Sequence, residues 1–317
     1  MKSDILILGG TGSIGYAFTQ NLLAKNRPVT LLVRNVAKAQ GIFEPNPLLE
    51  IIEGDAQNGA LLKELAQDKK VIFHGINYPY HEWKVNMMSV TQRIIEAASI
   101  NNAQIIFPGN VYNYGNMATP IVENSPEKPC SIKGQLRVEL ETTLREAARQ
   151  GKCNVLIVRL PDFWGENVQN EGVKPIFMNA LKGKAMPWLI RIDIPHQAVY
   201  TPDAAEIMVR LMLATANSTF ELYNYGGQIH DNIQTLFEQI AKQAHVKPKF
   251  MVYPKWMVAI LAWFIPVLKE IQEMYYLYEN TVVLNDDKLR NLFPDFHETS
   301  LEEAIQNTLR WFKQYSK

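Results

Sequence analysis

The stretch Asp4-Ile-Leu-Ile-Leu-Gly-Gly-Thr-Gly-Ser-Ile-Gly15 decides the fold of this chain of 317 residues. Ile5 to Leu8 is a short apolar run, typical of a fully buried parallel strand. Gly9, Gly12 and Gly15 then follow in the pattern G-x-x-G-x-x-G. These glycines permit a tight turn, a close approach of the main chain to a diphosphate, and close packing of the next helix on the strand. The stretch therefore predicts a dinucleotide site formed by Gly9, Gly10, Thr11, Gly12, Ser13, Ile14 and Gly15, at the N-terminus of a helix.

The next residues complete a strand, helix and strand unit. Asn26 to Pro28 ends the helix, and Val29 to Val33 is a second apolar run rich in β-branched residues. An NAD site has an acidic residue about 20 positions beyond the glycines for the ribose 2′-hydroxyl. This chain has Arg34 there, and a guanidinium can hold a 2′-phosphate with paired hydrogen bonds. We therefore predict NADP(H), with NAD(H) as the other option; Arg34 could instead simply end the strand at the surface.

The composition narrows the class of protein. Lys and Arg together number 32, as do Asp and Glu, so no bulk charge attracts nucleic acid or an anionic membrane. Cys130 and Cys153 are the two cysteines, and no Cys/His cluster has the spacing of metal ligands. This composition suits a reducing compartment, and the first apolar run is too short for a signal peptide. We expect a cytoplasmic protein with no metal site and a small-molecule substrate.

One apolar segment needs a separate explanation. Trp256 to Leu268 is a run of 13 uncharged residues between Lys255 and Lys269, and it contains Pro266. A membrane span needs about 20 residues, so we expect no span here. The simplest interpretation is a buried helix. An apolar substrate wall, a dimer contact and a shallow membrane contact are the alternatives.

Strand and helix patterns alternate along the first half of the chain. Further strands are expected over residues 49–53, 71–75, 104–107 and 154–158, and helices over 58–68, 85–100 and 133–150. This order predicts an α/β fold with a doubly wound, Rossmann-type parallel sheet covered on both faces. We expect a dinucleotide-binding domain over 1–160. A smaller, interleaved substrate lobe is expected over 161–317, with helices over 202–215, 231–244 and 300–315, and with about residues 190–225 returning to the sheet.

Several further pieces resemble the extended or atypical short-chain dehydrogenase/reductases, a group known broadly as NAD-dependent epimerase/dehydratases. The similar pieces are Gly54-Asp55, Phe73-His-Gly75, Val85-Asn86, Val111-Tyr-Asn-Tyr-Gly115, Val158-Arg-Leu-Pro-Asp-Phe-Trp-Gly165 and Val199-Tyr-Thr-Pro-Asp203. The resemblance covers nearly the whole chain. It implies that Asp55 and Ala56 lie near the adenine, and that Gly75, Ile76 and Asn77 flank the ribose and nicotinamide. It also implies a possible homodimer through the helices over 85–100 and 133–150.

The chain departs from this family at the expected catalytic dyad. The family uses a Ser or Thr after the fifth strand and a Tyr-x-x-x-Lys pair on the next helix, in which Tyr exchanges the proton. Here Asn110 stands at the Ser position, Lys133 at the Tyr position and Arg137 at the Lys position. Arg137 could still bond a ribose hydroxyl, but Lys133 would need strong desolvation to act as a base.

Other side chains could supply the proton. Tyr112 and Tyr114 lie in the loop expected to cover the nicotinamide, and either phenol could donate to a carbonyl; aromatic packing of the loop is the favoured alternative. A literal Tyr-x-x-x-Lys occurs at Tyr80 to Lys84, but it follows the fourth strand and therefore comes from a different part of the fold.

Three further polar residues have two interpretations each. His74 on the fourth strand is expected to be a packed histidine, with cofactor contact as the alternative. Asp162, at the end of the sixth strand, is either a site residue or the cap of a turn. His196 is expected in a surface loop, although it could contact substrate.

Two functions remain open from the sequence. The first is an NADP(H)-dependent reductase, epimerase or dehydratase that acts on a small polar or sugar-like metabolite with a non-standard proton donor. The second is a dinucleotide-binding sensor or protein-interaction module that has lost proton transfer. The aromatic-rich second half favours the enzyme, because a sensor needs no second ligand cleft.

Overall fold

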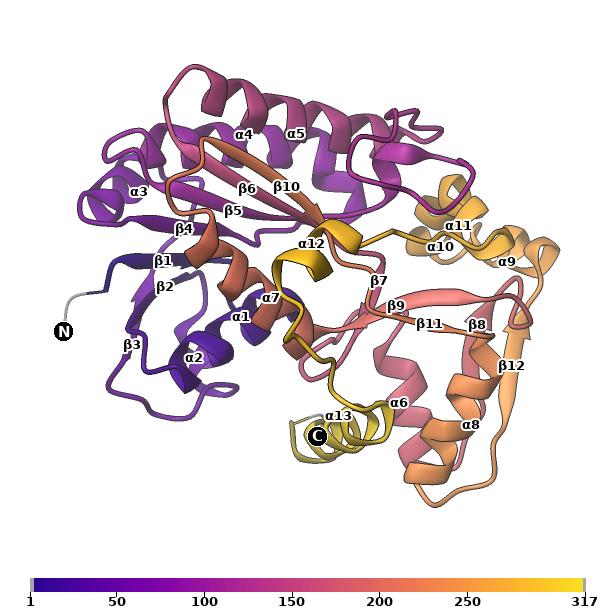
Figure 1. Cartoon of the computed structure of the whole chain (residues 1–317). Coiled ribbons are helices and arrows are strands. Elements are labelled where there is room, and N and C mark those ends of the chain that lie inside the picture. The colour runs from indigo at the N-terminus through magenta and orange to yellow at the C-terminus, as the bar shows by residue number, and fades with distance from the viewer. Residues whose placement is uncertain (1–2, 316–317) are drawn as a thin grey trace. The chain divides into compact units, whose positions relative to one another are not determined.

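The computed structural model describes residues 3–315, which form two compact units (Figure 1). The first, called the sheet unit here, comprises the chain up to Asn110, Leu136–Arg159 and Ala204–Tyr223. The second unit comprises Val111–Gln135, Leu160–Asp203 and the chain from Asn224 onward. The sequence predicted a single division after residue 160. In the structure, residues 111–135 belong to the second unit and residues 204–223 belong to the sheet unit.

A seven-stranded sheet forms the centre of the sheet unit, in the order β10-β6-β5-β4-β1-β2-β3. Its strands are β1 (Ile5–Leu8), β2 (Val29–Val33), β3 (Leu49–Glu53), β4 (Val71–His74), β5 (Gln104–Gly109), β6 (Asn154–Arg159) and β10 (Phe220–Asn224). From β3 to β6, neighbouring strands pair in parallel, for example with Leu6 opposite Thr30 and Ile72. All residues of β1 and β2 are buried, as expected for central strands covered on both faces.

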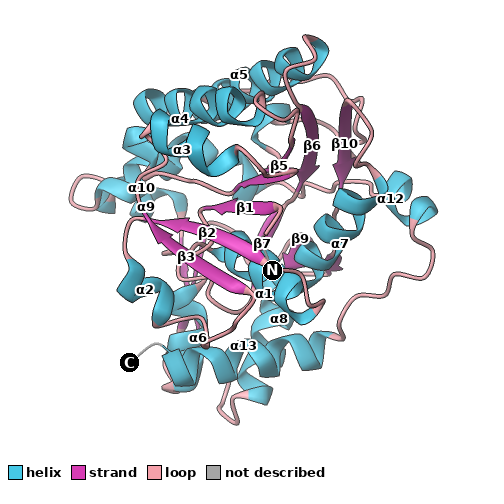
Figure 2. Ribbon diagram, turned by 90° about the vertical axis from the view of Figure 1, so that its left-hand side faces the viewer, coloured by secondary structure: helices cyan, strands magenta, loops and turns pink. Residues whose placement is uncertain are grey.

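Helices cover both faces of this sheet, as Figures 1 and 2 show. On one face lie α3 (Gly59–Ala66), α4 (Trp83–Ala98) and α5 (Ile132–Arg149); on the other lie α1 (Ser13–Ala24), α2 (Val36–Gln40) and α7 (Thr201–Ala214). The predicted doubly wound parallel sheet is confirmed. Each helix and strand predicted for this part of the chain is present, with ends that differ by a few residues.

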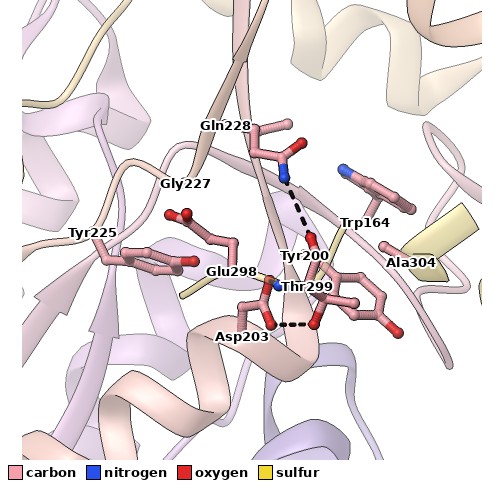
Figure 3. Close-up of a pocket in the computed structure, with 10 residues that line it drawn as sticks. Trp164, Tyr200, Asp203, Tyr225, Gly227, Gln228, Glu298, Thr299 and Ala304 are labelled. Atoms are coloured by element: carbon pink, nitrogen blue, oxygen red, sulfur yellow. Dashed lines mark hydrogen bonds between the residues drawn. The ribbon is translucent and has the colours of Figure 1, made fainter. Parts of the chain in front are cut away.

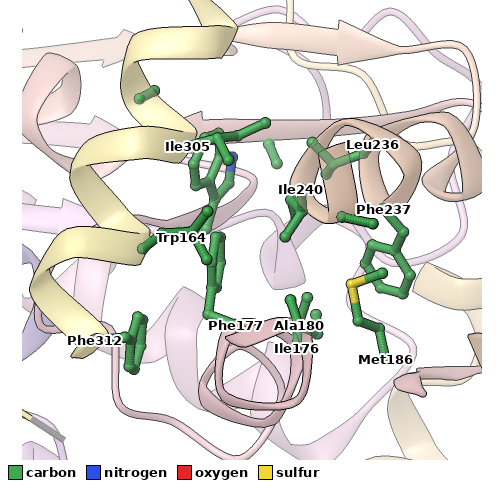
Figure 4. Packing of buried hydrophobic residues seen from close by; sticks show 14 of the residues in the cluster. Trp164, Ile176, Phe177, Ala180, Met186, Leu236, Phe237, Ile240, Ile305 and Phe312 are labelled. Carbon is green, nitrogen blue, oxygen red and sulfur yellow. The ribbon is translucent and has the colours of Figure 1, made fainter. Parts of the chain in front are cut away.

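The second unit has two small sheets and its own core. β11 (Gln228–His230), β9 (His196–Tyr200) and β7 (Asp162–Trp164) form one sheet, while β8 (Met186–Leu189) pairs in parallel with β12 (Phe250–Tyr253). Helices α6 (Lys174–Leu181), α8 (Ile233–Gln243) and α13 (Leu301–Tyr315) pack around the core in Figure 4. Phe177 and Phe312 stack there with ring centroids 5.5 Å apart. The aromatic-rich sequence of this half thus supplies a separate hydrophobic core.

The segment from Trp256 to Leu268 is not a buried helix, so that prediction was wrong. It is divided between two short helices, α9 (Lys255–Leu261) and α10 (Pro266–Ile271), because proline is favoured in the first turn of a helix and not in its interior. Several of its large apolar side chains are exposed, including Trp263 at 88%. Among residues 3–315, no helix combines the length and the apolar character needed to cross a bilayer.

The remaining elements are short. They are the 3-10 turns at Tyr80–Glu82, Tyr112–Tyr114 and Gln272–Met274, and the helices α11 (Tyr276–Glu279) and α12 (Asp287–Leu292).

Candidate active site

The turn after β1 has no room for side chains at two of its glycines. Gly9 has a φ of +80°, and a Cβ there would lie 2.4 Å from the carbonyl oxygen of Gly75, which follows β4. A Cβ on Gly15 would lie 2.4 Å from the Gly9 carbonyl oxygen and 2.9 Å from the Gly10 Cα. The turn, the start of α1 and the loop after β4 are therefore in direct contact, and only glycine permits it.

Gly12 differs from these two, because only one atom lies close to where its Cβ would be. The nearest atom to a Cβ there is the Gly9 carbonyl oxygen at 3.2 Å, and Gly12 is exposed. It is also the N-cap of α1, whose first turn has no acidic residue. By contrast, Asn35, Asn58 and Asn232 cap α2, α3 and α8 with their side chains. The N-terminus of α1 thus presents main-chain amides and a positive dipole end to a ligand, which fits a diphosphate.

The residues expected around the adenosine meet at the carboxyl ends of β2, β3 and β4. Arg34 is exposed directly after β2, and Asp55 accepts a hydrogen bond from the main-chain N–H of Gln57 at 2.8 Å. The Gln57 side chain donates to the Tyr78 hydroxyl at 3.0 Å. Burial raises the pKa of Tyr78, and the charges of Asp55 and Arg34 act on it in opposite directions. Tyr78 and Gln57 were missed by the sequence analysis, since neither lies in a recognisable pattern.

Ala56 is buried beside Asp55, whereas Ile76 is half-buried and Asn77 is exposed after Gly75. These residues lie in the loops that follow β3 and β4, at the edge of the sheet where the glycine turn begins. Open α/β sheets bind ligands outside the carboxyl ends of their strands. The part that these residues play in binding a cofactor stays a prediction.

Arg137 is held against aromatic rings in the sheet unit. Its guanidinium carbon lies 4.6 Å from the Trp83 ring centroid and 5.5 Å from that of Phe107. Such stacking keeps the guanidinium plane fixed. His74 packs nearby, where its Nε2 lies 2.9 Å from the Thr91 hydroxyl. Burial, with the positive charge of Arg137, lowers the pKa of His74 to about 3, so the ring is neutral and packed.

In the second unit, Lys133 is bound by two carboxylates. Its side chain is 5% exposed, and its Nζ donates to a carboxylate oxygen of Glu270 at 2.7 Å, to the Glu270 carbonyl at 3.0 Å and to Glu273. Glu273 also accepts from the main-chain N–H of Ile132 at 2.6 Å. Charge-assisted bonds of this kind hold the Lys133 ammonium group in one position.

The two loop tyrosines have different surroundings. Tyr114 is 1% exposed within a cluster formed with Val111, Ile121 and Leu284, and its hydroxyl lies 3.4 Å from the Val122 carbonyl oxygen. Tyr112 packs on the same cluster but is only partly buried. Packing therefore accounts for Tyr114, while the Tyr112 side chain retains access to solvent.

Comparison with known proteins supports the architecture. The model of the NAD dependent epimerase/dehydratase family matches residues 5–226. The chain belongs to this family. Its full length also aligns with UDP-N-acetyl-alpha-D-glucosaminuronate decarboxylase of Bacillus cytotoxicus, at 24% identity over 343 residues and 99% of each chain.

Two further proteins are similar to this chain to different extents. The dTDP-6-deoxy-L-talose 4-dehydrogenase (NAD(P)(+)) of Kitasatospora kifunensis is 28% identical over 172 residues, 51% of this chain and 52% of that one. The structure of UDP-glucuronic acid 4-epimerase from Bacillus cereus in complex with NAD superposes with a TM-score of 0.79 at 18% identity, over 99% of each chain. At that identity the likeness establishes the fold alone.

Asp162 and His196 form a pair in the structure, whereas the sequence analysis considered each of them alone. Asp162 opens β7, His196 opens β9, and the Asp162 carboxylate lies 3.0 Å from the His196 Nε2. The His196 ring also packs edge-on against Trp188 at 5.3 Å. His196 thus lies on a strand with its side chain 13% exposed, and not in a surface loop as expected. The two strand starts become neighbours only through the small sheet, so no local pattern could reveal the pair.

The literal Tyr-x-x-x-Lys lies in the sheet unit, away from any family position. Tyr80 packs edge-on against Trp83 with ring centroids 5.1 Å apart, and Lys84 is exposed on α4. Within residues 3–315, no group of three or more His, Cys, Asp or Glu side chains has the geometry of a metal site.

A small cavity in the second unit is lined by both polar and apolar side chains and is too tight for a substrate (Figure 3). Asp203 points into it and accepts hydrogen bonds from the Thr299 main-chain N–H at 3.0 Å and the Thr299 hydroxyl at 2.6 Å. Burial raises the pKa of Asp203 to about 6. This cluster fixes the start of α7 to the segment before α13, which is a structural role.

Proposed function

We propose that this protein is an NAD(P)(H)-dependent enzyme of the epimerase, dehydratase or decarboxylase type that acts on a nucleotide sugar or a similar sugar-like metabolite. The observation that carries the proposal is the turn after β1, where Gly9 and Gly15 exclude any Cβ and Gly12 opens onto an uncapped helix. The names of the two curated relatives, which act on UDP- and dTDP-linked sugars, support the substrate class. We expect this enzyme in the cytoplasm.

We propose NADP(H) as the preferred cofactor. Arg34 is exposed at the end of β2, where a ribose 2′-phosphate would need a cation, and no acidic residue occupies that position. The family is named for NAD, and the superposed epimerase holds NAD, so the preference rests on Arg34 alone.

A bound nicotinamide would accept or return a hydride, and the chain would supply the proton and the fixed charges. Tyr112 is our proposed proton donor, since its side chain is accessible, whereas the Tyr114 hydroxyl is buried against the Val122 carbonyl. Lys133 would hold its positive charge in place through Glu270 and Glu273, and Arg137 would position a ribose hydroxyl. These roles replace the Tyr-x-x-x-Lys dyad.

The test combines binding with turnover. Purified protein is titrated with NADPH and NADH and then incubated with either cofactor form and a panel of UDP- and dTDP-sugars, with products separated by chromatography. We expect tighter binding of NADPH and conversion of at least one nucleotide sugar. Arg34→Ala should weaken NADPH binding roughly 10- to 100-fold, the effect of losing hydrogen bonds to a charged group, and leave NADH binding unchanged.

Tighter NADH binding would refute the cofactor preference alone. A protein that binds cofactor but converts nothing in the panel would refute the enzyme. The second candidate function is then favoured, a dinucleotide-binding sensor or interaction module. The specific observation for it is that Lys133, at the position of the family Tyr, is bound by two carboxylates.

A homodimer through α4 and α5 remains a prediction. The apolar side chain of Val85, at the start of α4, is 73% exposed and would be covered in such a dimer.

A further inference from the structure

A hydrogen bond between Gln57 and Tyr78 joins two loops of the sheet unit that the strand order keeps apart. Gln57 follows β3 and Tyr78 follows β4, and in the sheet these strands lie on either side of β1 and β2. The Gln57 Nε2 nevertheless donates to the Tyr78 hydroxyl at 3.0 Å. The glycine turn and Arg34 follow the carboxyl ends of β1 and β2. The bond therefore lies at the edge of the sheet where the cofactor is expected.

The partners of the Gln57 side chain fix which of its atoms faces Tyr78. Its Oε1 accepts from the Ser89 hydroxyl at 3.0 Å and from an Arg93 guanidinium nitrogen at 2.5 Å, both on α4. A guanidinium can only donate, so the amide oxygen must face Arg93 and the amide nitrogen must face Tyr78. The Gln57 Nε2 also lies 3.4 Å from the Asn86 carbonyl oxygen, to which it donates. The Tyr78 hydroxyl is therefore the acceptor in its bond with Gln57.

The hydrogen of the Tyr78 hydroxyl thus remains available to a ligand. A phenol that accepts one hydrogen bond can still donate one, and within residues 3–315 no oxygen accepts this hydrogen. The main chain of Tyr78 is held in place, because its carbonyl oxygen accepts from the Trp83 indole N–H at 2.8 Å. Burial raises the pKa of Tyr78, so the phenol keeps its proton at neutral pH. Tyr78 is therefore a fixed, neutral hydrogen-bond donor.

The charges around Tyr78 indicate which group of a ligand it would meet. Asp55 and Arg34 both act on its pKa, so the hydroxyl lies within electrostatic reach of the cation proposed to hold a ribose 2′-phosphate. The Arg34 guanidinium can bond two oxygens of a phosphate, which has three acceptor oxygens. One oxygen is then left for a neutral donor such as a phenol. A ribose 2′-hydroxyl gains less from such a donor, because it carries no charge.

We propose that Tyr78 is a specificity-determining residue of the cofactor site, whose hydroxyl donates to the 2′-phosphate of NADP(H) beside Arg34 while Gln57 holds it in place. The proposal rests on the proposed function, because it needs a dinucleotide at the turn after β1. It adds a neutral contact that distinguishes the two cofactor forms. Gln57 is a positioning residue, because it acts through Tyr78.

The test is calorimetric titration of the full chain with NADPH, NADH, adenosine 2′,5′-bisphosphate and adenosine 5′-monophosphate. Tyr78→Phe keeps the ring and removes only the hydroxyl. We expect it to weaken binding of the two ligands with a 2′-phosphate about tenfold or more, as for a lost hydrogen bond to a charged group, and to change binding of the other two less than about twofold. Tyr80→Phe is the matched control in the same loop, since its ring packing against Trp83 is retained, and it should change neither.

Gln57→Glu tests the positioning role. The new carboxylate can keep the bonds from Ser89 and Arg93, but it would accept the Tyr78 hydrogen, which then no longer reaches the phosphate. We therefore expect Gln57→Glu to weaken binding of adenosine 2′,5′-bisphosphate at least as much as Tyr78→Phe. The double variant should lose clearly less than the product of the two single effects, because both remove the same contact. Fully multiplicative losses would refute the role of Gln57.

The outcomes separate this proposal from the proposed function. The proposal fails alone if the unmodified protein binds NADPH and Tyr78→Phe binds all four ligands equally well. It also fails alone if Tyr78→Phe weakens NADPH and NADH binding to the same extent, because the hydroxyl then supports the loop and not the phosphate. An unmodified protein that binds neither cofactor form would refute the proposed function and this proposal together.

Discussion

The middle and the start of helix α5 hold their charged side chains in different ways. In the sheet unit, Glu141 of α5 pairs with Arg159 of β6, and the two side chains are 0% and 1% exposed. In the second unit, Lys133 at the start of α5 is bound by Glu270 and Glu273, whose side chains are 33% and 24% exposed. One pair is sealed from water, while the other cluster is half open to it.

The difference separates a structural pair from a candidate functional cluster. The buried pair of Glu141 and Arg159 fixes the helix to the sheet. A Cβ on Gly109 would lie 2.9 Å from Arg159 and 3.1 Å from Glu141, so the space beside this pair leaves no room for a larger residue at position 109. Water can replace the partners of a half-open cluster, so its charges can respond to a ligand. Stability should therefore depend mainly on Glu141, and activity mainly on Lys133.

The strongest test of this comparison is Glu141→Gln. Removing the carboxylate leaves the Arg159 guanidinium charged in a dry site, and we expect the free energy of unfolding to fall by about 3–5 kcal/mol. Urea denaturation measures it. The matched control Glu141→Leu/Arg159→Met removes both charges and should recover most of the loss. A loss below about 1 kcal/mol in Glu141→Gln would show that the pair does not anchor α5.

Acid unfolding gives the second test. The pKa of His74 is lowered to about 3 by burial and by Arg137, so the folded protein binds fewer protons than the unfolded chain below pH 6.5. Stability is complete above pH 6.5 and should fall by about 1.4 kcal/mol per pH unit below it, roughly 3 kcal/mol by about pH 4.

The measurement for His74 is the free energy of unfolding between pH 7 and about pH 4. His74→Gln should flatten this dependence, whereas Lys133→Met should not. If His74→Gln lost stability with acid as steeply as the unmodified protein, the acid sensitivity would lie at another group.

The smallest effect on stability is expected for Lys133→Met. Glu270 and Glu273 remain partly hydrated, so we expect the free energy of unfolding to fall by about 1–2 kcal/mol. The loss of turnover, expressed as an increase in activation free energy, should be much larger. Arg149→Met is the control on the same helix, since Arg149 and Glu146 are both exposed, and it should change neither quantity. A Lys133→Met variant with normal turnover would remove Lys133 from the proposed site.

The sequence predicted the sheet unit well, because its strands and helices depend on local patterns. Gly9 is needed for the positive φ of the turn and Gly15 for contacts with Gly9 and Gly10, and the apolar runs of β1 and β2 reflect burial on both faces. Such requirements are visible in a short window of sequence.

The candidate site was less predictable, because its contacts join distant parts of the chain. Lys133 meets Glu270 and Glu273, and Asp162 meets His196, through packing that no local pattern encodes. The apolar run at 256–268 was misinterpreted for a related reason. Periodicity shows that a segment is apolar, but burial depends on which other elements pack against it.

The contact between Gly9 and Gly75 also limits how this protein can be redesigned. A methyl group at Gly9 would meet the peptide after β4, and the turn after β1 would have to shift to relieve the overlap. Neither loop can therefore be varied alone in a mutant library. Attempts to change cofactor selectivity have a better starting point in Arg34, whose exposed side chain can be exchanged while both loops keep their shape.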